Sequence, residues 1–581
     1  MSDFGHGERG GWITFPYITA GVVGVTVAGG GCLANIIVYM IEEFQVKSID
    51  AAQILNVFGG SACLVPVAGA VIADSFWGCF SVIWVSSSIS LLGAVLLTLT
   101  ATIDSLRPQP LTLINGASSP PSSAAVGNPA SKFQLAILYA GINLTSIGVG
   151  GMRFTIATMG ANQFQKPKDR GVFFNWYLVV LYTSVVFSST VVVYIEDNLG
   201  WAWGFSLCIA ANALGLAVFV IGNRRYRHVK PQGSPFTGLA RVLVAAYRKR
   251  KLPVSSEVDD YYHGADVVAA TPSKSFKYLN RAALKDDGDI EPDGSIAKPW
   301  RLCSVQQVED LKTLIRIFPL WSTGIFLSTP LRFLSSLIIL QALTMDRRVG
   351  PHFKIPAGSM LVFVLASTAI SLTVIDRFVL PVWQRLAGRP PKVLQRIGVG
   401  HVLNVVGMAV AAMVESDRLR VARRRHLQEL PEGTVPMVVL WLVLQMAAVG
   451  IGEAFHYPGQ VAFYYQEFPA ALRSTATAMV AMHMGIAYYL STAVIDLIRR
   501  ITRWLPNDDI NKGRLDNVYW MLTVAGVLNF GYFLACARLY NYRNVETGDA
   551  TSGHIHNNNN NHTNGIGHDH QEQEKQELEC N

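Results

Sequence analysis

The sequence predicts an all-α integral membrane protein with twelve transmembrane helices arranged as two bundles of six. Only 15% of its 581 residues are charged, whereas soluble domains carry about 25% charged residues. The charges gather in short segments and leave twelve stretches of about 20 mostly apolar residues, a length that crosses a bilayer as a helix. A hydrophilic stretch over residues 223–313 separates the first six from the last six. This 6+6 layout predicts a substrate site between two bundles near the membrane midplane.

The order of these stretches gives the predicted organisation. Residues 1–14 lack the basic start and cleavage site of a signal peptide, so we expect the first span to act as an uncleaved insertion signal. The predicted parts are an N-terminal bundle (15–222), a linker (223–313), a C-terminal bundle (314–539) and a tail (540–581) whose polar composition predicts disorder. The predicted spans are 15–41, 51–72, 79–101, 133–161, 172–194, 200–221, 314–341, 355–376, 393–414, 435–463, 474–498 and 516–539.

Basic residues predict the orientation. The linker opens with NRRYRHVKP and contains RKRK at 248–251, and basic residues beside spans favour the cytoplasmic side. An even number of spans then places both termini in the cytoplasm as well. The segment RLRVARRRH (418–426) opposes this orientation, because we expect it in a loop on the other side. Residues 235–247 predict an amphipathic helix that either lies on the membrane surface or packs on the bundle.

Composition argues against several classes of protein. The net charge of +8 is spread over loops without a basic face, so we expect no nucleic-acid partner. The seven cysteines form neither CxxC pairs nor Cys/His clusters, which argues against disulfides and metal sites. No nucleophile–base set or phosphate-binding loop is present, so we expect neither an enzyme nor an ATP-driven pump. We expect no cofactor; the predicted partners are the lipid bilayer and a small-molecule or small anionic substrate, and nothing in the sequence sets an oligomeric state.

Arg153 is the most informative residue. It is the only charged residue between Phe133 and Ala161, a stretch long enough to cross a bilayer. A cation there costs several kcal/mol unless it faces a partner, a cavity or a ligand. The first span holds no acidic residue that could neutralise it. Arg153 therefore indicates a binding site for an anion; the alternative is a structural role, through a salt bridge or hydrogen bonds to backbone carbonyls.

Other polar residues inside the predicted spans are further candidates. Arg332 is a second anion contact, unless its long side chain reaches for the membrane interface. Glu453 is the only carboxylate that we place well inside an apolar span. It could neutralise an arginine, carry a proton, or stay protonated in a packed helix interface. His456, about one helical turn away, is a weaker candidate for proton handling. The candidate cavity hydroxyls, which could equally be packing residues, are those of Tyr39, Tyr182 and Tyr464.

Several motifs resemble a known family. GAVIADSFWG (69–78), with Gly69, Asp74 and Gly78, resembles the loop after the second span in the major facilitator superfamily. The ordered series that includes GVGGMRFTIATMGANQF, EDNLGWAWGF and GIGEAFHYPGQVAFYYQEFP resembles the plant nitrate/peptide branch of the proton-coupled oligopeptide transporter family. The GGWITFPYI opening and RLCSVQQVED are most similar to its nitrate excretion transporter group. The resemblance covers about residues 10–543 and implies the major facilitator fold.

The departures from this family concern proton coupling. The family carries an acidic pair and a base on the first helix, where this chain has Val22, Val25 and Thr26. Proton uptake requires a titratable group, which these side chains do not supply. The resemblance places the family's helix 4 cation at Arg153 and its helix 10 glutamate, which helps bind substrate or couple the two halves, at Glu453.

The favoured function is transport of a small anion, nitrate or else chloride, by alternating access. An arginine fork holds a planar oxyanion through two hydrogen bonds. Without the first-helix proton site, we expect a passive or weakly proton-coupled exporter in the plasma membrane or else the vacuolar membrane. One alternative is a carrier of the same fold for a plant glucoside, hormone or alkaloid. Another is a non-transporting sensor or partner protein.

Overall fold

The computed structural model describes residues 10–108, 130–153, 155–228, 235–264, 272–286, 288–292, 294–351, 353–427, 433–468, 476–506 and 509–540. The helices of the N-terminal bundle are α1 (Phe15–Ala34), α2 (Ile36–Glu42), α3 (Ser48–Ile72), α4 (Gly78–Thr102), α5 (Lys132–Arg153), α6 (Thr155–Ala161), α7 (Pro167–Phe187), α8 (Val193–Asn198) and α9 (Trp201–Ile221). Those of the linker are α10 (Pro235–Arg248) and α11 (Lys277–Asn280). Those of the C-terminal bundle are α12 (Val305–Leu343), α13 (Val362–Val374), α14 (Leu380–Ala387), α15 (Val393–Arg424), α16 (Trp441–Glu467), α17 (Ala476–Ile501) and α18 (Leu515–Leu539).

The predicted fold class is confirmed. Each predicted span coincides with a helix or an interrupted helix, and eleven helices of the described residues are long and apolar enough to cross a membrane. The predicted tenth span, α16, is not among those eleven, because Gln445, Glu453, His456 and Gln460 lower its hydropathy. It nevertheless packs in the C-terminal bundle against α13 and α15.

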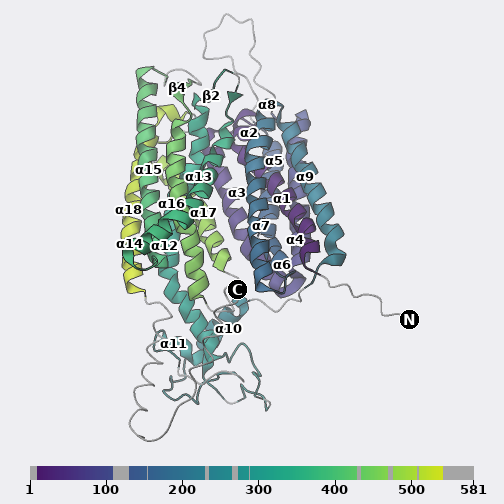
Figure 1. The fold of residues 1–581 in the computed structure, drawn as a ribbon, viewed down its shortest axis with the longest axis vertical. Helices are drawn as coiled ribbons and strands as arrows, with labels where there is room; N and C mark the ends of the chain where they lie inside the picture. The colour runs from purple at the N-terminus through teal and green to yellow at the C-terminus, as the bar shows by residue number, and fades with distance from the viewer. Residues whose placement is uncertain are drawn as a thin grey trace, which may run out of the picture. The chain divides into compact units, whose positions relative to one another are not determined.

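The helices run between two ends of the molecule, which Figure 1 shows clearly. We call the end that carries α10 and α11 the linker end. The other, the far end, carries two short strand pairs that the sequence did not predict. One pair is parallel, β1 (Met345–Asp346) with β4 (Val435–Val438), and the other is antiparallel, β2 (Arg348–Val349) with β3 (Phe353–Lys354).

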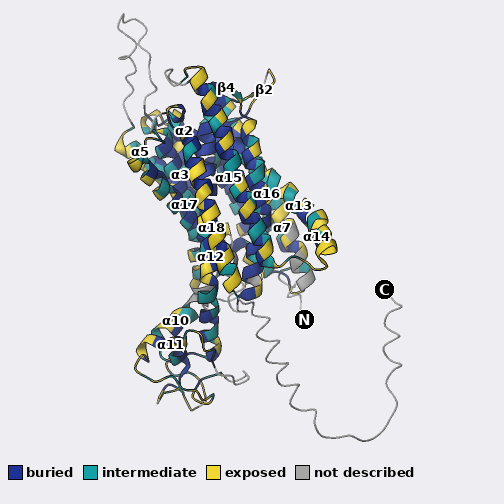
Figure 2. Cartoon of the chain, turned by 90° about the vertical axis from the view of Figure 1, so that its left-hand side faces the viewer, coloured by how far each residue is buried: buried dark blue, intermediate teal, exposed yellow. Residues whose placement is uncertain are grey.

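Large apolar side chains cover the outside of the helices, as expected where lipid is the solvent. Leu214, Leu386 and Leu528 are 68%, 84% and 71% exposed. Figure 2 shows exposed residues along the outer faces of α14 and α18, while buried residues fill the space between helices. This pattern, apolar outside and packed inside, fits a protein surrounded by hydrocarbon.

Two helices extend beyond their predicted spans. Helix α12 begins at Val305, within the predicted linker, because Ser304 and Gln307 form a reciprocal capping box there. The basic segment 418–426 does not lie wholly in a loop, since α15 continues to Arg424. Within this extension Arg418 is fully buried and its Nη2 lies 2.7 Å from Glu415 Oε1. One of the basic residues that opposed the predicted orientation is therefore neutralised inside the bundle.

The linker has a small core of its own. Helix α10 packs against α11 and α12 with Val242 and Ala245 buried, so of the two alternatives for residues 235–247 the structure shows packing on protein. Lys249 Nζ lies 2.6 Å from Asp289 Oδ2, and both side chains are buried. Cys303 is buried nearby, and this burial raises the pKa of its thiol to about 11.

The two bundles meet along α3 and α17. Gln53 Nε2 donates to Asp496 Oδ1 at 2.7 Å, and Arg499 Nη1 lies 2.8 Å from Asp50 Oδ1. Further along the same face, Gly59 has no side chain where the ring of Tyr488 packs: a Cβ there would lie 3.0 Å from the ring. Helix α3 is thus the part of the N-terminal bundle that reaches the C-terminal bundle most closely along its length.

Candidate functional site

Arg153 is an exposed cation inside a membrane-spanning helix. It is the last residue of α5, about two helical turns, or roughly 12 Å, from Ala161 at the end of the same span. Its side chain is exposed, and its guanidinium has no hydrogen bond or ion pair with any residue that the structure describes. The recorded contact of this residue is through its backbone, where the carbonyl accepts a 3.3 Å hydrogen bond from Tyr177 Oη. The structural alternative, a salt bridge within the bundle, is not observed among the described residues.

Val22 and Val25 lie where the resemblance implies the acidic pair of the family's first helix. Val22 and Val25 are buried and belong to one cluster with Met152 and Ile156, which flank Arg153 in sequence. Thr26 is partly buried. The first helix therefore packs against the Arg153 segment through hydrocarbon and supplies no counter-charge there.

The second candidate cation, Arg332, has a partner. Its Nη2 lies 3.0 Å from Glu453 Oε1, and its Nη1 donates to Tyr488 Oη at 3.3 Å. The guanidinium carbon also lies 5.3 Å from the centroid of the Tyr488 ring. Tyr457 interacts electrostatically with both charged groups. The structure thus brings Arg332 and Glu453 together as a pair that is mostly, but not fully, buried.

This pair lies at a depth that suits a substrate site. Arg332 is about three turns, roughly 16 Å, from the far end of α12, and Glu453 is roughly 18 Å from the far end of α16. These depths are about half the thickness of a hydrocarbon core of about 30 Å. Arg332 directs its guanidinium to Glu453 at this depth instead of extending toward an end of the helix.

One turn of α3 connects the two cations. The ring of Tyr488, whose hydroxyl accepts a hydrogen bond from Arg332, packs on Gly59. Ala62, one turn along α3, packs on Gly150, which lies three residues before Arg153. A Cβ on Gly150 would lie 2.7 Å from the carbonyl oxygen of Ala62, so this approach requires glycine. Cys63, next to Ala62, interacts electrostatically with both guanidinium groups. The two arginines, one from each bundle, thus interact with the same stretch of α3, either directly or through a neighbouring residue.

The remaining predicted site residues lie elsewhere. Tyr39 is buried among aromatic rings and shares a 2.9 Å hydrogen bond with Thr100. Tyr464 is buried and stacks on Phe468, and Tyr182 is half exposed; the structure records no contact of Tyr39, Tyr182 or Tyr464 with either arginine. His456 is buried with its ring centroid 5.0 Å from that of His401, and neither of its ring nitrogens has a hydrogen-bond partner in the described part of the chain.

The Gly69–Gly78 motif has a packing role at its first glycine. Gly69 packs on the backbone of Gly151, two residues before Arg153, at a distance where a Cβ would lie 3.2 Å from the carbonyl oxygen. Gly78 has a φ of +74°, which favours glycine. The side chain of Asp74 lies outside the described residues.

The sequence missed several polar residues around these groups. Tyr457 and Tyr488 were not singled out, because a tyrosine in a span usually packs. Glu453 is also not the only carboxylate inside the bundles: Glu196 and Glu415, each just beyond a predicted span end, are 2% and 0% exposed. The signal that could have found Glu415 is its spacing to Arg418, since residues three apart face each other on a helix.

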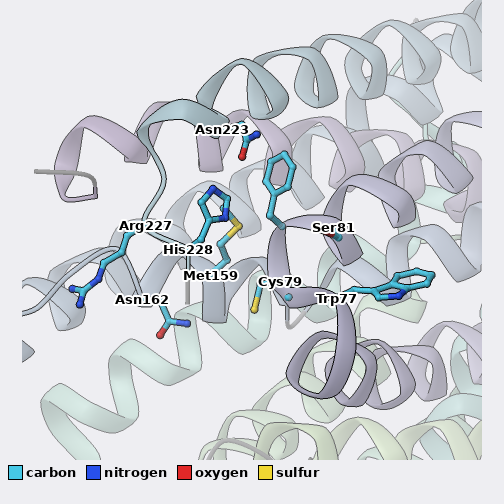
Figure 3. A pocket seen from close by; sticks show the side chains of 10 residues that line it. Trp77, Cys79, Ser81, Met159, Asn162, Asn223, Arg227 and His228 are labelled. Atoms are coloured by element: carbon cyan, nitrogen blue, oxygen red, sulfur yellow. The ribbon is translucent and has the colours of Figure 1, made fainter. Parts of the chain in front are cut away.

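A separate pocket of about 410 Å³ opens at the linker end of the N-terminal bundle. Figure 3 shows that the side chain of Arg227, which helps to line the pocket, extends away from those of His228 and Met159. The lining includes neither Arg153 nor Arg332. Its residues are Trp77, Gly78, Cys79, Phe80, Ser81, Met159, Asn162, Asn223, Arg227 and His228.

Two packed bundles of membrane-spanning helices, with charged side chains near mid-membrane, define a multi-pass membrane transporter of the major facilitator type. The family described as PTR2, POT family, matches residues 80–511. The chain therefore belongs to the POT family.

Known relatives agree with this assignment. NRT1/PTR FAMILY 2.7 of Arabidopsis thaliana is 52% identical over 540 residues, which cover 93% of this chain and 94% of that protein. NRT1/PTR FAMILY 2.6 of the same plant is 51% identical over 542 residues, covering 93% and 95%. The crystal structure of the POT family transporter PepTSo superposes with a TM-score of 0.64 at 15% identity and covers 90% of this chain and 98% of that one. A peptide transporter POT in complex with sulfate gives a TM-score of 0.59 at 12% identity, covering 93% and 95%. At these identities the solved structures support the fold.

Proposed function

We propose that this chain carries a small monovalent anion, with nitrate as the first candidate and chloride as the second. The observation that carries the proposal is the exposed Arg153 guanidinium, which lies inside a membrane span without a counter-charge in the described residues. A cation in that position is stabilised by an anionic ligand. Arginine also presents two parallel N–H donors, which match the oxygens of a planar oxyanion such as nitrate.

Two further observations support an anionic substrate. Arg332 supplies a second guanidinium near mid-membrane, and its pair with Glu453 uses one carboxylate oxygen, at 3.0 Å. In addition, a peptide transporter of the same fold has been solved in complex with sulfate, an oxyanion. The motifs that resemble the nitrate excretion transporter group favour nitrate over other anions of this size.

We infer that transport is passive or weakly proton-coupled and directed outward at the plasma membrane. Valines replace the acidic pair of the first helix and pack in an apolar cluster, so the usual proton site of the family is missing. A monovalent anion leaving a cell with a negative interior needs no proton, since 100 mV contributes about 2.3 kcal/mol per charge. The orientation that goes with this proposal places the linker end in the cytoplasm, where its basic residues favour it.

The test is flux into liposomes that contain the purified protein. With a potassium diffusion potential and equal pH on both sides, we expect nitrate to follow the potential, and an R153A variant to show little flux at nitrate concentrations that half-saturate the wild-type protein. A strict requirement for an inward proton gradient, with acidification matched to nitrate uptake, would contradict passive transport. Absence of any nitrate or chloride flux, together with uptake of a glucoside, hormone or alkaloid, would replace the anion by the second class of substrate. Absence of all flux would favour a sensor or partner protein.

A further inference from the structure

Glu196 is a buried carboxyl that the proposed anion site does not use. It lies in α8, near the far end of its span, and is 2% exposed. Neither carboxyl oxygen has a hydrogen-bond partner among the described residues. Its side-chain stem packs directly over Gly204 of α9, where any larger residue would collide with it. The carboxyl is therefore enclosed in the N-terminal bundle and faces neither lipid nor water.

No positive charge acts on this carboxyl within the described part of the chain. The titratable groups around it are Cys32 on α1, Cys208 on α9 and Asp197 on α8 itself, and the π-helical turn Ser188–Val192 supplies none. Arg347 pairs with Asp197, at 3.9 Å, and not with Glu196. An ionised carboxylate is strongly disfavoured in such a place unless it is paired. These surroundings favour the neutral, protonated form of the carboxyl.

Asn35 links Glu196 to the contact between the two bundles. Its carboxamide, fully buried at the junction of α1 and α2, interacts with the Glu196 carboxyl. On its other side it packs on Gly358 in the turn Ala357–Leu361 of the C-terminal bundle. A Cβ on Gly358 would lie 2.7 Å from Asn35 Oδ1. One side chain thus separates the buried carboxyl from the opposite bundle.

Other contacts close the far end around this point. Ser359 Oγ donates to the Ser189 carbonyl at 2.8 Å. The ring of Tyr194 stacks on that of Phe353 with centroids 6.2 Å apart. Together with the Asp197–Arg347 pair, these contacts join the N-terminal bundle to the C-terminal bundle. Opening of the far end during alternating access must break them, and it would also withdraw Gly358 from Asn35 and admit water to Glu196.

We propose that Glu196 is a proton-binding site that keeps the far end closed while it is protonated. When the far-end contacts separate, the O–H bond of the carboxyl breaks, water on the far side takes the proton, and the carboxylate is hydrated. Closure requires the proton to return. Acid on the far side therefore favours the closed form, and one proton site can change the ratio of closed to open molecules by up to about tenfold per pH unit. The inference depends on the proposed function in one respect, since it assumes that the protein works by alternating access.

The test measures far-end opening without any substrate. Spin labels introduced as unnatural amino acids at Leu199 and Val349, which are 66% and 40% exposed, report the distance across the far end and leave the cysteines in place. In nitrate-free liposomes we expect the closed population of the wild-type protein to grow as pH falls. In E196Q, a neutral isostere, we expect the closed population to dominate and its pH dependence to vanish.

Two control variants separate Glu196 from the other far-end carboxylates. E42Q and D197N each remove a carboxylate near Arg347 and should keep a pH-dependent closed population, because Glu196 is unchanged. Asp197 is a charge next to Glu196, so the comparison with D197N concerns the presence of pH dependence and not its midpoint. Persistence of the pH dependence in E196Q, or its loss in either control, would overturn the proposal.

A second measurement covers the case in which E196Q does not fold. Infrared spectra of the wild-type protein are recorded under acid and alkaline conditions and subtracted. The difference should contain the carbonyl stretch of a protonated carboxyl that appears as the far end closes. Absence of this band would also refute the proposal. Because neither readout involves transport, a failure here is distinct from a failure to carry nitrate.

Discussion

Replacing Arg153 with alanine separates a ligand-binding role from a structural one. The guanidinium is exposed and makes no hydrogen bond or ion pair with the described residues, so its removal breaks no contact that we can identify. Surface substitutions of this kind usually change stability by less than about 0.5 kcal/mol. We therefore expect R153A to reach the membrane in normal amounts and to unfold at close to the wild-type temperature.

The expected effect on transport is much larger. An arginine that holds nitrate through two charge-assisted hydrogen bonds contributes about 1.5 kcal/mol for each, at the lower end of the usual range. The loss of about 3 kcal/mol corresponds to roughly a hundredfold weaker apparent affinity. R153K retains the charge but loses the planar fork, so we expect partial flux and weaker discrimination between nitrate and chloride.

The assay is initial nitrate flux in liposomes, divided by the amount of folded protein and measured over a range of nitrate concentrations. Arg420→Ala is a suitable control, because Arg420 is exposed, bonds only to Asp417 in the described structure and lies beyond the apolar stretch 393–414. Normal flux per folded molecule in R153A would refute the assignment. A large loss of folded protein in both Arg153 variants, with normal flux in what survives, would show that the residue holds helices together.

Three further predictions follow from individual contacts. E453Q leaves Arg332 without its counter-charge, so we expect a loss of about 3 kcal/mol in stability and tighter apparent anion binding. Thermal unfolding with and without nitrate measures both effects. Unchanged unfolding temperatures would show that Glu453 serves only in helix packing. Gly150→Ala forces a Cβ against a backbone oxygen and should destabilise by about 1–3 kcal/mol, whereas Gly238→Ala, with open space around it, should not. Since burial raises the pKa of Cys303 to about 11, we expect its labelling by maleimide at pH 8, followed by mass spectrometry, to be slow until the linker unfolds.

The positions of the spans could be predicted because hydropathy reports directly on burial in lipid. The exceptions have physical causes. Helix α12 begins earlier than its apolar stretch because Ser304 and Gln307 cap a polar extension that precedes this stretch. Helix α15 runs on through basic residues because Arg418 is neutralised by Glu415 one turn away. A hydropathy scale counts Arg418 and Glu415 as polar and does not recognise that they neutralise each other.

The candidate site was only partly predictable. Arg153, Arg332 and Glu453 stand out because a charge in an apolar stretch is costly wherever the chain folds. Tyr488 does not stand out, since its role depends on a contact with Arg332 across two helices that are far apart in sequence. Glu196 was missed because its helix extends beyond the apolar stretch and because only the packing of Asn35 and Gly204 shows that it is buried.

The charges near mid-membrane also bear on which anions fit. In the proposed site, Arg153 and Arg332 would contribute two positive charges and Glu453 one negative charge, so one positive charge would remain for the substrate. A monovalent anion neutralises it, whereas a divalent anion leaves an excess negative charge in a region of low dielectric constant, where uncompensated charge is costly. An anion that approaches Arg332 also competes with Glu453 for the same guanidinium. On the proposed function, binding weakens the Arg332–Glu453 pair on the C-terminal bundle while it engages Arg153 on the N-terminal bundle. Such a ligand has a different affinity for the two arrangements of the bundles, and this difference is what allows binding to shift their equilibrium.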